Sequence, residues 1–167
     1  MICGIGTDIV DVGRIRKAVE RWGDRFLKRV FTEAEVVYCL AKANPYPHLA
    51  ARFAAKEAVM KALSSLWGAQ EHRVPTPVTA GQETDNPGAG LHSGKDQPHS
   101  RQRGLQPGHL RFKDIEISNR PSGQPFVRLR SVAWESLDSL SIHLSMSHEH
   151  DMAIAMVVLE KASRERL

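Results

Sequence analysis

Two acidic residues that lie far apart in the sequence could act together on a phosphate group. Asp8 follows a glycine-rich apolar run, and Glu57 lies in the segment RFAAKEAVMKAL. Two carboxylates of this kind can hold Mg²⁺, which prefers oxygen ligands and completes its shell with substrate phosphate. Arg52, Lys56 and Lys61 would surround Glu57 with positive charge that suits a metal-bound diphosphate. These residues therefore predict metal-dependent phosphate chemistry.

The same segment also has a purely structural interpretation. At 3.6 residues per turn its apolar side chains form one stripe of a helix, made of Leu49, Phe53, Met60 and Leu63. Lys56 falls inside this stripe, where it could simply extend its stem over apolar neighbours. Glu57 precedes Lys61 by one turn, a pairing worth about 0.2–0.5 kcal/mol on any helix surface. On this segment alone the structural interpretation is the simpler one.

A basic stripe follows Asp8. Arg14, Lys17 and Arg21 recur at helical spacing, and Arg25 and Lys28 continue the positive charge. The stripe is either a solvated helix face or a docking face for an acidic partner, which could be an acidic helical protein or a nucleic acid. The chain carries a net charge of +4, but its aromatic residues are few and are not interleaved with the basic ones. This composition argues against a nucleic-acid partner.

A third polar cluster, SMSHEHD, lies near the end of the chain at residues 145–151. A Ser-His-Asp triad would need a nucleophile elbow, and neither Ser145 nor Ser147 lies in one. A zinc site is also disfavoured, because His148 and His150 would point to opposite faces of a strand. The cluster either lines a pocket at a hairpin turn or is only a polar turn.

The elements that must position these residues follow from local patterns. MICGIGTDIV predicts a strand ending near Asp8, and Val12, Ile15, Val19 and Trp22 predict the apolar side of a helix. A capping-box pattern begins a second helix, which Asn44-Pro45 should end, and a third helix should run from about His48 to Leu66.

The second half of the chain is expected to contain mainly strands. Residues 69–109 are rich in Gly, Pro, Gln and His, and predict a flexible insertion. The segments RFKDIEIS and FVRLR predict two strands joined by the turn NRPSGQP. Residues 131–140 predict a short helix, and the two final strands should meet at SHEHD, with Ser147 on the same face as His143. This order predicts an α+β fold with helices packed on an antiparallel sheet.

The amino-acid composition, with 41% hydrophobic and 25% charged residues, is typical of a globular protein. The length predicts one domain over residues 1–167. Two cysteines without ligand or disulfide spacing favour a reducing, cytoplasmic setting. We expect no signal peptide, because Asp8 and Asp11 interrupt the first apolar run, and no membrane span, because no run of about 18 apolar residues occurs.

Three separated stretches resemble one family. GIGTDIVDVGRI, RFAAKEAVMKAL and HLSMSH are similar, in this order, to the motifs of the holo-acyl-carrier-protein synthases, the small 4′-phosphopantetheinyl transferases. The resemblance extends over most of the chain apart from the insertion. It implies transfer of the phosphopantetheine arm of coenzyme A to a serine of apo acyl carrier protein, in support of fatty acid biosynthesis. Adenosine 3′,5′-bisphosphate would be the second product.

The resemblance also implies roles for individual residues. Asp8 and Glu57 would hold Mg²⁺ and, with Lys61, form the catalytic set. The residues that would contact coenzyme A are Arg52, Lys56, Lys61, Ser147 and His148. The acidic carrier protein would dock on Arg14, Arg21 and Arg25. The family further implies a homotrimer with its active sites at subunit boundaries.

Two questions stay open at this point. The base that accepts the serine proton could be a water or hydroxide on the metal, or Asp8 or Glu57 directly. The family usually continues its second motif with a Gly-Thr-Gly turn, whereas this chain reads LSSLWGAQ. A tolerated loop expansion, a shifted reading frame, or an impaired relative that only binds its carrier or coenzyme A would each explain the difference.

Overall fold

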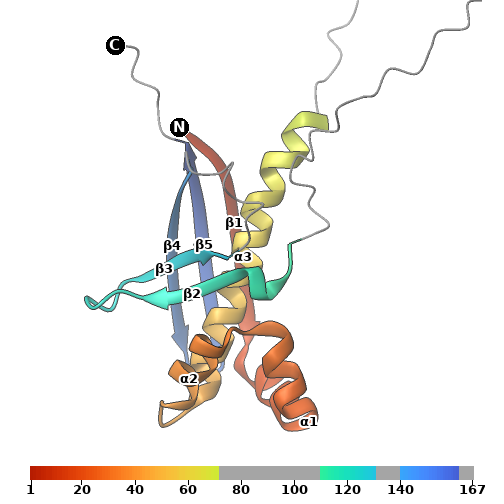
Figure 1. Ribbon diagram of the computed structural model, residues 1–167, viewed down its shortest axis with the longest axis vertical. Coiled ribbons are helices and arrows are strands. Elements are labelled where there is room, and N and C mark those ends of the chain that lie inside the picture. Colours follow the sequence, from red (N-terminus) through yellow and green to blue (C-terminus); the bar gives the residue numbers. More distant parts are fainter. Residues whose placement is uncertain (72–109, 131–139, 162–167) are drawn as a thin grey trace, which may run out of the picture.

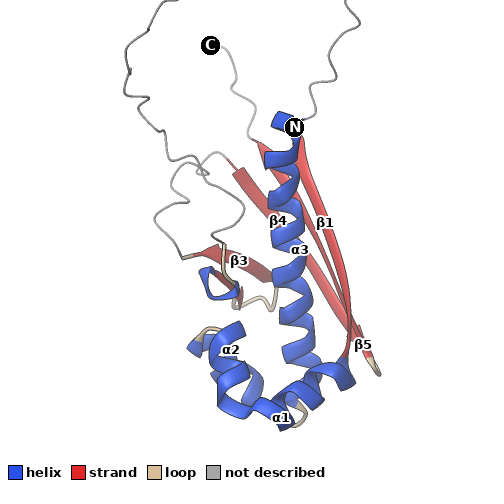
Figure 2. Ribbon diagram, turned by 90° about the vertical axis from the view of Figure 1, so that its right-hand side faces the viewer, coloured by secondary structure: helices blue, strands red, loops and turns tan. Residues whose placement is uncertain are grey.

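The computed structural model describes residues 1–71, 110–130 and 140–161. A three-stranded antiparallel sheet with strand order β1-β5-β4 forms one layer, and the long helix α3 packs along it (Figures 1 and 2). The bounds of these elements are Ile2–Asp11 for β1, Leu140–Glu149 for β4, Met152–Lys161 for β5 and Pro45–Glu71 for α3. The predicted α+β class with antiparallel pairing is confirmed.

Strand β5 shows why α3 covers only one face of this sheet. Its small and branched residues Ala153, Ala155, Val157 and Leu159 are buried, whereas Met152, Ile154 and Met156 between them are exposed. Successive side chains of a strand point to opposite faces, so the buried set lies under α3. The predicted turn at SHEHD joins β4 to β5, and His143, Ser145 and Ser147 are all exposed, as their alternation indicates.

A second, two-stranded sheet is separate from the first in its hydrogen bonding, although β3 packs against β4. It pairs β2 (Ile115–Asn119) with β3 (Pro125–Leu129) in antiparallel register. The predicted turn between the two strands is confirmed, with Gly123 at φ 87°, a backbone conformation that favours glycine. Phe112 was expected in the first of these strands, but it begins a short 3₁₀-helix, Phe112–Asp114. Two sheets therefore replace the single sheet that the sequence predicts.

Helices α1 (Val12–Val30) and α2 (Glu33–Leu40) pack at one end of α3 (Figure 2). The capping box of α2 is confirmed, because Thr32 Oγ accepts from the Glu35 N–H and the Glu35 carboxylate accepts from the Thr32 N–H. Helix α1 is kinked at Gly23, where φ is 48°. Trp22, next to the kink, is 50% exposed and does not belong to the apolar face predicted for it.

Helix α3 is longer than predicted at both ends. Asn44-Pro45 does not end α2, which stops at Leu40; instead it starts α3, with proline at the first helical position and Asn44 Oδ1 accepting from the Tyr46 N–H at 3.3 Å. The helix then continues past Leu66 to Glu71, through the stretch where the family usually has its glycine turn. The rest of the predicted insertion lies outside the described residues, as does the helix predicted at 131–140 except for Leu140, which begins β4.

The described helices include none that is both long and apolar enough to cross a membrane.

Gly4 and Gly6 allow β1 to approach α3 closely. A β-carbon on Gly6 would overlap the carbonyl oxygen of Ala58, and one on Gly4 would overlap that of Ala62. The obstructing atoms belong to the helix backbone and cannot move aside as a side chain could. We therefore expect Gly6→Ala to lower the free energy of unfolding by about 1–3 kcal/mol, in the range of overpacked cores. Urea denaturation measures the change, and the exposed neighbour Thr7→Ala serves as control. Equal stability of the two variants would contradict this close packing.

Candidate active site

Asp8, Glu57 and Lys61 line one cavity of about 400 Å³ between β1, α3 and the start of α1. Asp8 comes from β1, while Glu57 and Lys61 are one turn apart on α3. Lys61 Nζ lies 2.7 Å from Asp8 Oδ1 and 2.9 Å from the carbonyl oxygen of Thr7. The i,i+4 pair between Glu57 and Lys61 does not form, because the lysine bridges to the strand instead. Residues 53 positions apart in the sequence thus form one polar cluster.

The electrostatics of the cavity favour a cation between the carboxylates. Partial burial raises the pKa of Glu57, the nearby carboxylate of Asp8 raises it further, and Lys61 opposes both effects. The two acids are therefore close enough to repel each other, and a divalent cation would relieve that repulsion. Mg²⁺ takes one or two carboxylates from the protein and completes its shell with water and phosphate. The two carboxylates at this cavity, those of Asp8 and Glu57, are oxygen donors of the kind that such a site needs.

Arg14 lies at the rim of the same cavity. Asp11 caps α1, its Oδ1 accepting from the Arg14 N–H at 2.7 Å, which fixes the first turn of the helix beside β1. Arg21 and Arg25 lie farther along α1 and are exposed, and the guanidinium of Arg21 stacks over the Trp22 ring at 4.8 Å. The basic stripe of α1 therefore starts at the cavity and continues away from it.

Lys56 lies elsewhere and requires a correction. Its side chain is 0% exposed, and its ammonium is 2.7 Å from Glu35 Oε2, a carboxylate that is itself 1% exposed. The same ammonium donates to the carbonyl oxygens of Val30, Phe112 and Ile115 at 2.8–2.9 Å. All of its hydrogen-bonding capacity is thus used inside the protein. The predicted contact of Lys56 with coenzyme A does not fit this placement.

A second cavity of about 340 Å³ contains the other predicted residues, Arg52, Ser147 and His148. Arg52 donates to Asn119 Oδ1 at 2.7 Å and its guanidinium stacks 4.1 Å from the centre of the Tyr38 ring. Its Nε atom is buried and has no hydrogen-bond partner among the described residues. A buried cationic side chain with an unused donor suits an anionic ligand.

His48 also lines this second cavity, although the sequence does not single it out. It lies one turn before Arg52 on α3, and its ring meets that of His148 edge-on at 5.1 Å between centroids. Burial lowers the pKa of His48, and the positive charges of His148, Arg52 and Lys42 lower it further. Its spacing of four from Arg52 is the one sequence signal that could have found it.

The two cavities lie on different faces of α3. Phe53, Glu57 and Lys61, spaced by four, face the first cavity, whereas His48 and Arg52 face the second. The two lining sets share no residue. Within one chain, therefore, the predicted site is divided between two places.

Comparisons with known proteins agree on one family. Residues 4–82 match the family model described as the 4′-phosphopantetheinyl transferase superfamily. The holo-[acyl-carrier-protein] synthase of Halothermothrix orenii is 39% identical over 165 residues, covering 96% of this chain and 99% of the relative. That of Thermodesulfovibrio yellowstonii is 36% identical, covering 95% and 99%.

Solved structures give the same result. The holo-(acyl-carrier-protein) synthase of Bacillus anthracis, in complex with CoA (3′,5′-ADP), has a TM-score of 0.61 at 28% identity, covering 97% of this chain and 99% of that one. The Helicobacter pylori enzyme in complex with coenzyme A has a TM-score of 0.61 at 29% identity, covering 93% and 99%. The chain belongs to the holo-[acyl-carrier-protein] synthase family within the 4′-phosphopantetheinyl transferase superfamily.

Proposed function

We propose that this protein transfers the 4′-phosphopantetheine group of coenzyme A to a serine of apo acyl carrier protein, with Mg²⁺, in the cytoplasm and in support of fatty acid biosynthesis. The observation that carries the proposal is the Asp8–Glu57–Lys61 cluster, in a chain that aligns with holo-[acyl-carrier-protein] synthases over nearly its whole length. The impaired, binding-only alternative is not favoured, because the full acidic and basic set of the cluster is present.

The residues of the first cavity would have different roles in the reaction. The serine oxygen bonds to the β-phosphorus of coenzyme A while the bond from that phosphorus to the bridging oxygen breaks, and adenosine 3′,5′-bisphosphate leaves. Asp8 and Glu57 would hold Mg²⁺, which supplies positive charge to the diphosphate when bound. Lys61 lies 2.7 Å from Asp8, where it can stabilise charge that develops on the phosphate oxygens. The serine proton passes to one of the two carboxylates or to a water between them.

The second cavity would bind the nucleotide end of coenzyme A. Arg52 lines this cavity and would offer its guanidinium charge to a phosphate, and Ser147 and His148 would lie beside the nucleotide. Lys56 is left out of this assignment, because its ammonium is buried and fully paired. The carrier protein would dock on Arg14, Arg21 and Arg25, which places its serine near the first cavity at the start of α1.

We propose a homotrimer for two reasons. The sheet face opposite α3 carries exposed apolar side chains, namely Ile5, Ile9, Met152, Ile154 and Met156, and the described elements leave that face uncovered. The division of the predicted site between two cavities also supports assembly, since one subunit could contribute its first cavity and a neighbour its second to the same coenzyme A.

The transfer assay tests the function directly. The protein is mixed with apo acyl carrier protein, coenzyme A and Mg²⁺, and the carrier is weighed by mass spectrometry. We expect a mass gain of one phosphopantetheine arm that disappears when a chelator removes the metal. No gain, under conditions in which a known transferase reacts to completion, would refute the proposal. Binding of the carrier without transfer would favour the binding-only alternative.

A further inference from the structure

His48 and His148 form a pair of histidine rings in the second cavity, and His48 has no role in the reaction proposed above. The two rings meet edge-on, with centroids 5.1 Å apart and planes at 80°. His48 is half-buried near the start of α3, whereas His148 is exposed on β4. Tyr38 of α2 also meets the His48 ring edge-on, with centroids 6.3 Å apart. Side chains of α2 and β4 thus hold the His48 ring at this cavity.

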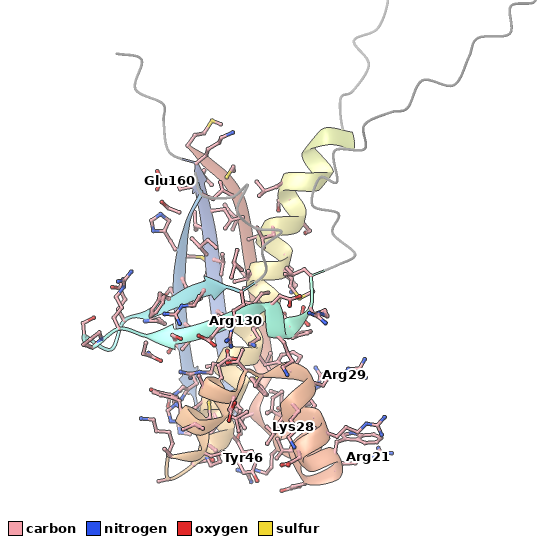
Figure 3. The ribbon with its side chains drawn as sticks, in the orientation of Figure 1. Arg21, Lys28, Arg29, Tyr46, Arg130 and Glu160 are labelled. Carbon is pink, nitrogen blue, oxygen red and sulfur yellow. The ribbon has the colours of Figure 1, made fainter. Side chains whose placement is uncertain are left out.

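The start of α3, which carries His48, is held in place by its own contacts. Figure 3 shows Tyr46, two residues before His48, at the end of α3 that lies beside α1. The guanidinium of Arg16, from α1, lies 4.9 Å from the centre of the Tyr46 ring. Asn44 Oδ1 accepts from the Tyr46 N–H at 3.3 Å. These contacts order the first turn of the helix, so His48 lines the cavity from a fixed position.

The charged groups that act on His48 are basic. They are His148 of β4, Arg52 one turn later on α3, and Lys42 just after α2, while the remaining titratable group that faces His48 is the phenol of Tyr38. The described residues that line the cavity include no carboxylate. Burial lowers the pKa of His48, and the three positive charges lower it further. The positive end of the α3 dipole acts in the same direction. His48 is therefore mostly neutral at pH 7 in the ligand-free protein.

An anionic ligand would reverse this preference. A phosphate within about 4–6 Å stabilises the charged form of an imidazole. The protonated ring donates from both of its nitrogens, whereas the neutral ring donates from only one. A phosphate that enters the cavity beside Arg52 should therefore cause His48 to take up a proton from solvent. The protonated ring would then add a second cationic donor to the guanidinium of Arg52.

We propose that His48 is a further ligand-binding residue of the second cavity, and that it takes up a proton when the nucleotide end of coenzyme A places a phosphate beside His48 and Arg52. The inference rests on the proposed function and adds a pH dependence to its nucleotide site. A bound phosphate raises the pKa of His48 above its value in the ligand-free protein. Between these two values binding takes up a proton, so affinity falls as the pH rises; above both values His48 stays neutral and affinity no longer changes through it.

Adenosine 3′,5′-bisphosphate is a suitable probe, because it carries nucleotide phosphates but has no arm to transfer. Calorimetric titration in two buffers with different heats of ionisation gives its Kd and the number of protons taken up, at about pH 6.5, 7.5 and 8.5 and at one Mg²⁺ concentration. The ionisation of the probe itself is common to every protein compared.

Two single variants are compared with the unaltered protein. His48→Gln keeps a hydrogen-bond donor at the cavity but cannot take up a proton. His150→Asn is the matched control, because His150 is exposed, pairs with Glu149 at 2.6 Å and does not line the cavity. Asparagine also tolerates the positive φ of 46° at this position. Thermal unfolding confirms that both variants are folded.

We expect the unaltered protein to take up between about half a proton and one proton per bound molecule at pH 7.5. Its Kd should rise about threefold to tenfold from pH 6.5 to pH 8.5, since one linked proton changes affinity by at most about tenfold per pH unit. His48→Gln should lose most of this proton uptake and bind more weakly at pH 6.5, but bind about as well as the unaltered protein at pH 8.5, where His48 is neutral. His150→Asn should behave as the unaltered protein does.

Three results would overturn the inference. The first is binding of the probe without proton uptake, and the second is equal uptake in the unaltered protein and in His48→Gln, which would assign the proton to another group. The third is a loss of affinity in His48→Gln that is the same at every pH, which would indicate only the shape of the ring. No binding of the probe at any pH would overturn both this inference and the nucleotide assignment of the cavity. Absence of transfer to the carrier would instead refute the proposed function, so the two failures are distinguishable.

Discussion

Replacing Glu57 by glutamine is expected to reduce phosphopantetheine transfer by about 10²–10³-fold and to leave the fold intact. The substitution keeps the shape of the side chain but removes the charge that Mg²⁺ prefers in its ligands. The loss is of the size found when one electrostatic contact to a developing charge is removed. The mass gain of the carrier measures the rate. Calorimetric titration with Mg²⁺ in the absence of coenzyme A measures the metal site independently of turnover.

Stability should change in the opposite direction from activity. Burial and Asp8 raise the pKa of Glu57, so its charged form is disfavoured in the folded, metal-free protein. Glutamine carries no charge, and we expect the variant to unfold in urea at a concentration equal to or higher than the unaltered protein. Glu160→Gln, on an exposed carboxylate near the end of β5, provides the matched control with unchanged activity. Full transfer activity of Glu57→Gln would remove Glu57 from the metal site.

The sequence predicts the local parts of this molecule well. The capping box at Thr32, the hairpin turn at Gly123 and the alternation in β4 each depend on residues a few positions apart. Such patterns are set by backbone geometry and by hydrogen bonds between residues close in sequence. All the residues that determine them therefore lie in one short stretch. Asp8 and Glu57 are predicted as site residues for a different reason, since they lie in separate motifs that together resemble one family, and the structure places both on one cavity.

What the sequence does not predict depends on contacts between distant segments. Helical periodicity places Lys56 on an apolar face but cannot say that Glu35, 21 positions earlier, lies opposite its ammonium. The sequence likewise places Arg52 and Lys61 in one motif, although their side chains line different cavities. The end of α3 was predicted near Leu66 because the composition changes from Ala69 onward, whereas the helix continues to Glu71 and LSSLWGAQ has no residue that stops a helix before its glycine.

Lys56 joins segments that lie on both sides of residues 72–109. Its ammonium contacts the end of α1 through Val30, α2 through Glu35, and the chain after residue 109 through Phe112 and Ile115. Glu35 extends this set, because its Oε1 accepts from the Ile117 N–H at 2.9 Å. Burial lowers the pKa of Lys56 and Glu35 opposes that shift. The pair therefore holds β2 against the helices.

We expect Lys56→Met to lower the free energy of unfolding by about 3–5 kcal/mol, the usual cost of removing one partner from a buried ion pair. Methionine fills much of the space but leaves the Glu35 carboxylate without its cation and removes the ammonium that donates to the carbonyl oxygens of Val30, Phe112 and Ile115. This loss is a large part of the 5–15 kcal/mol that stabilises a typical domain. Urea denaturation measures it. The double variant Glu35→Gln with Lys56→Met should recover part of the loss, because no unpaired charge remains buried.

Lys61→Met supplies the matched comparison within the same motif. Lys61 is half exposed and its pair with Asp8 is open to solvent, so its loss should change stability by less than about 1 kcal/mol. Transfer should nevertheless fall strongly, since the charge beside the diphosphate is gone. The two lysines are thus expected to give opposite phenotypes, Lys56→Met an unstable protein and Lys61→Met a stable but inactive one. A stable Lys56→Met variant with weakened coenzyme A binding would show instead that Lys56 leaves its buried pair to contact the ligand.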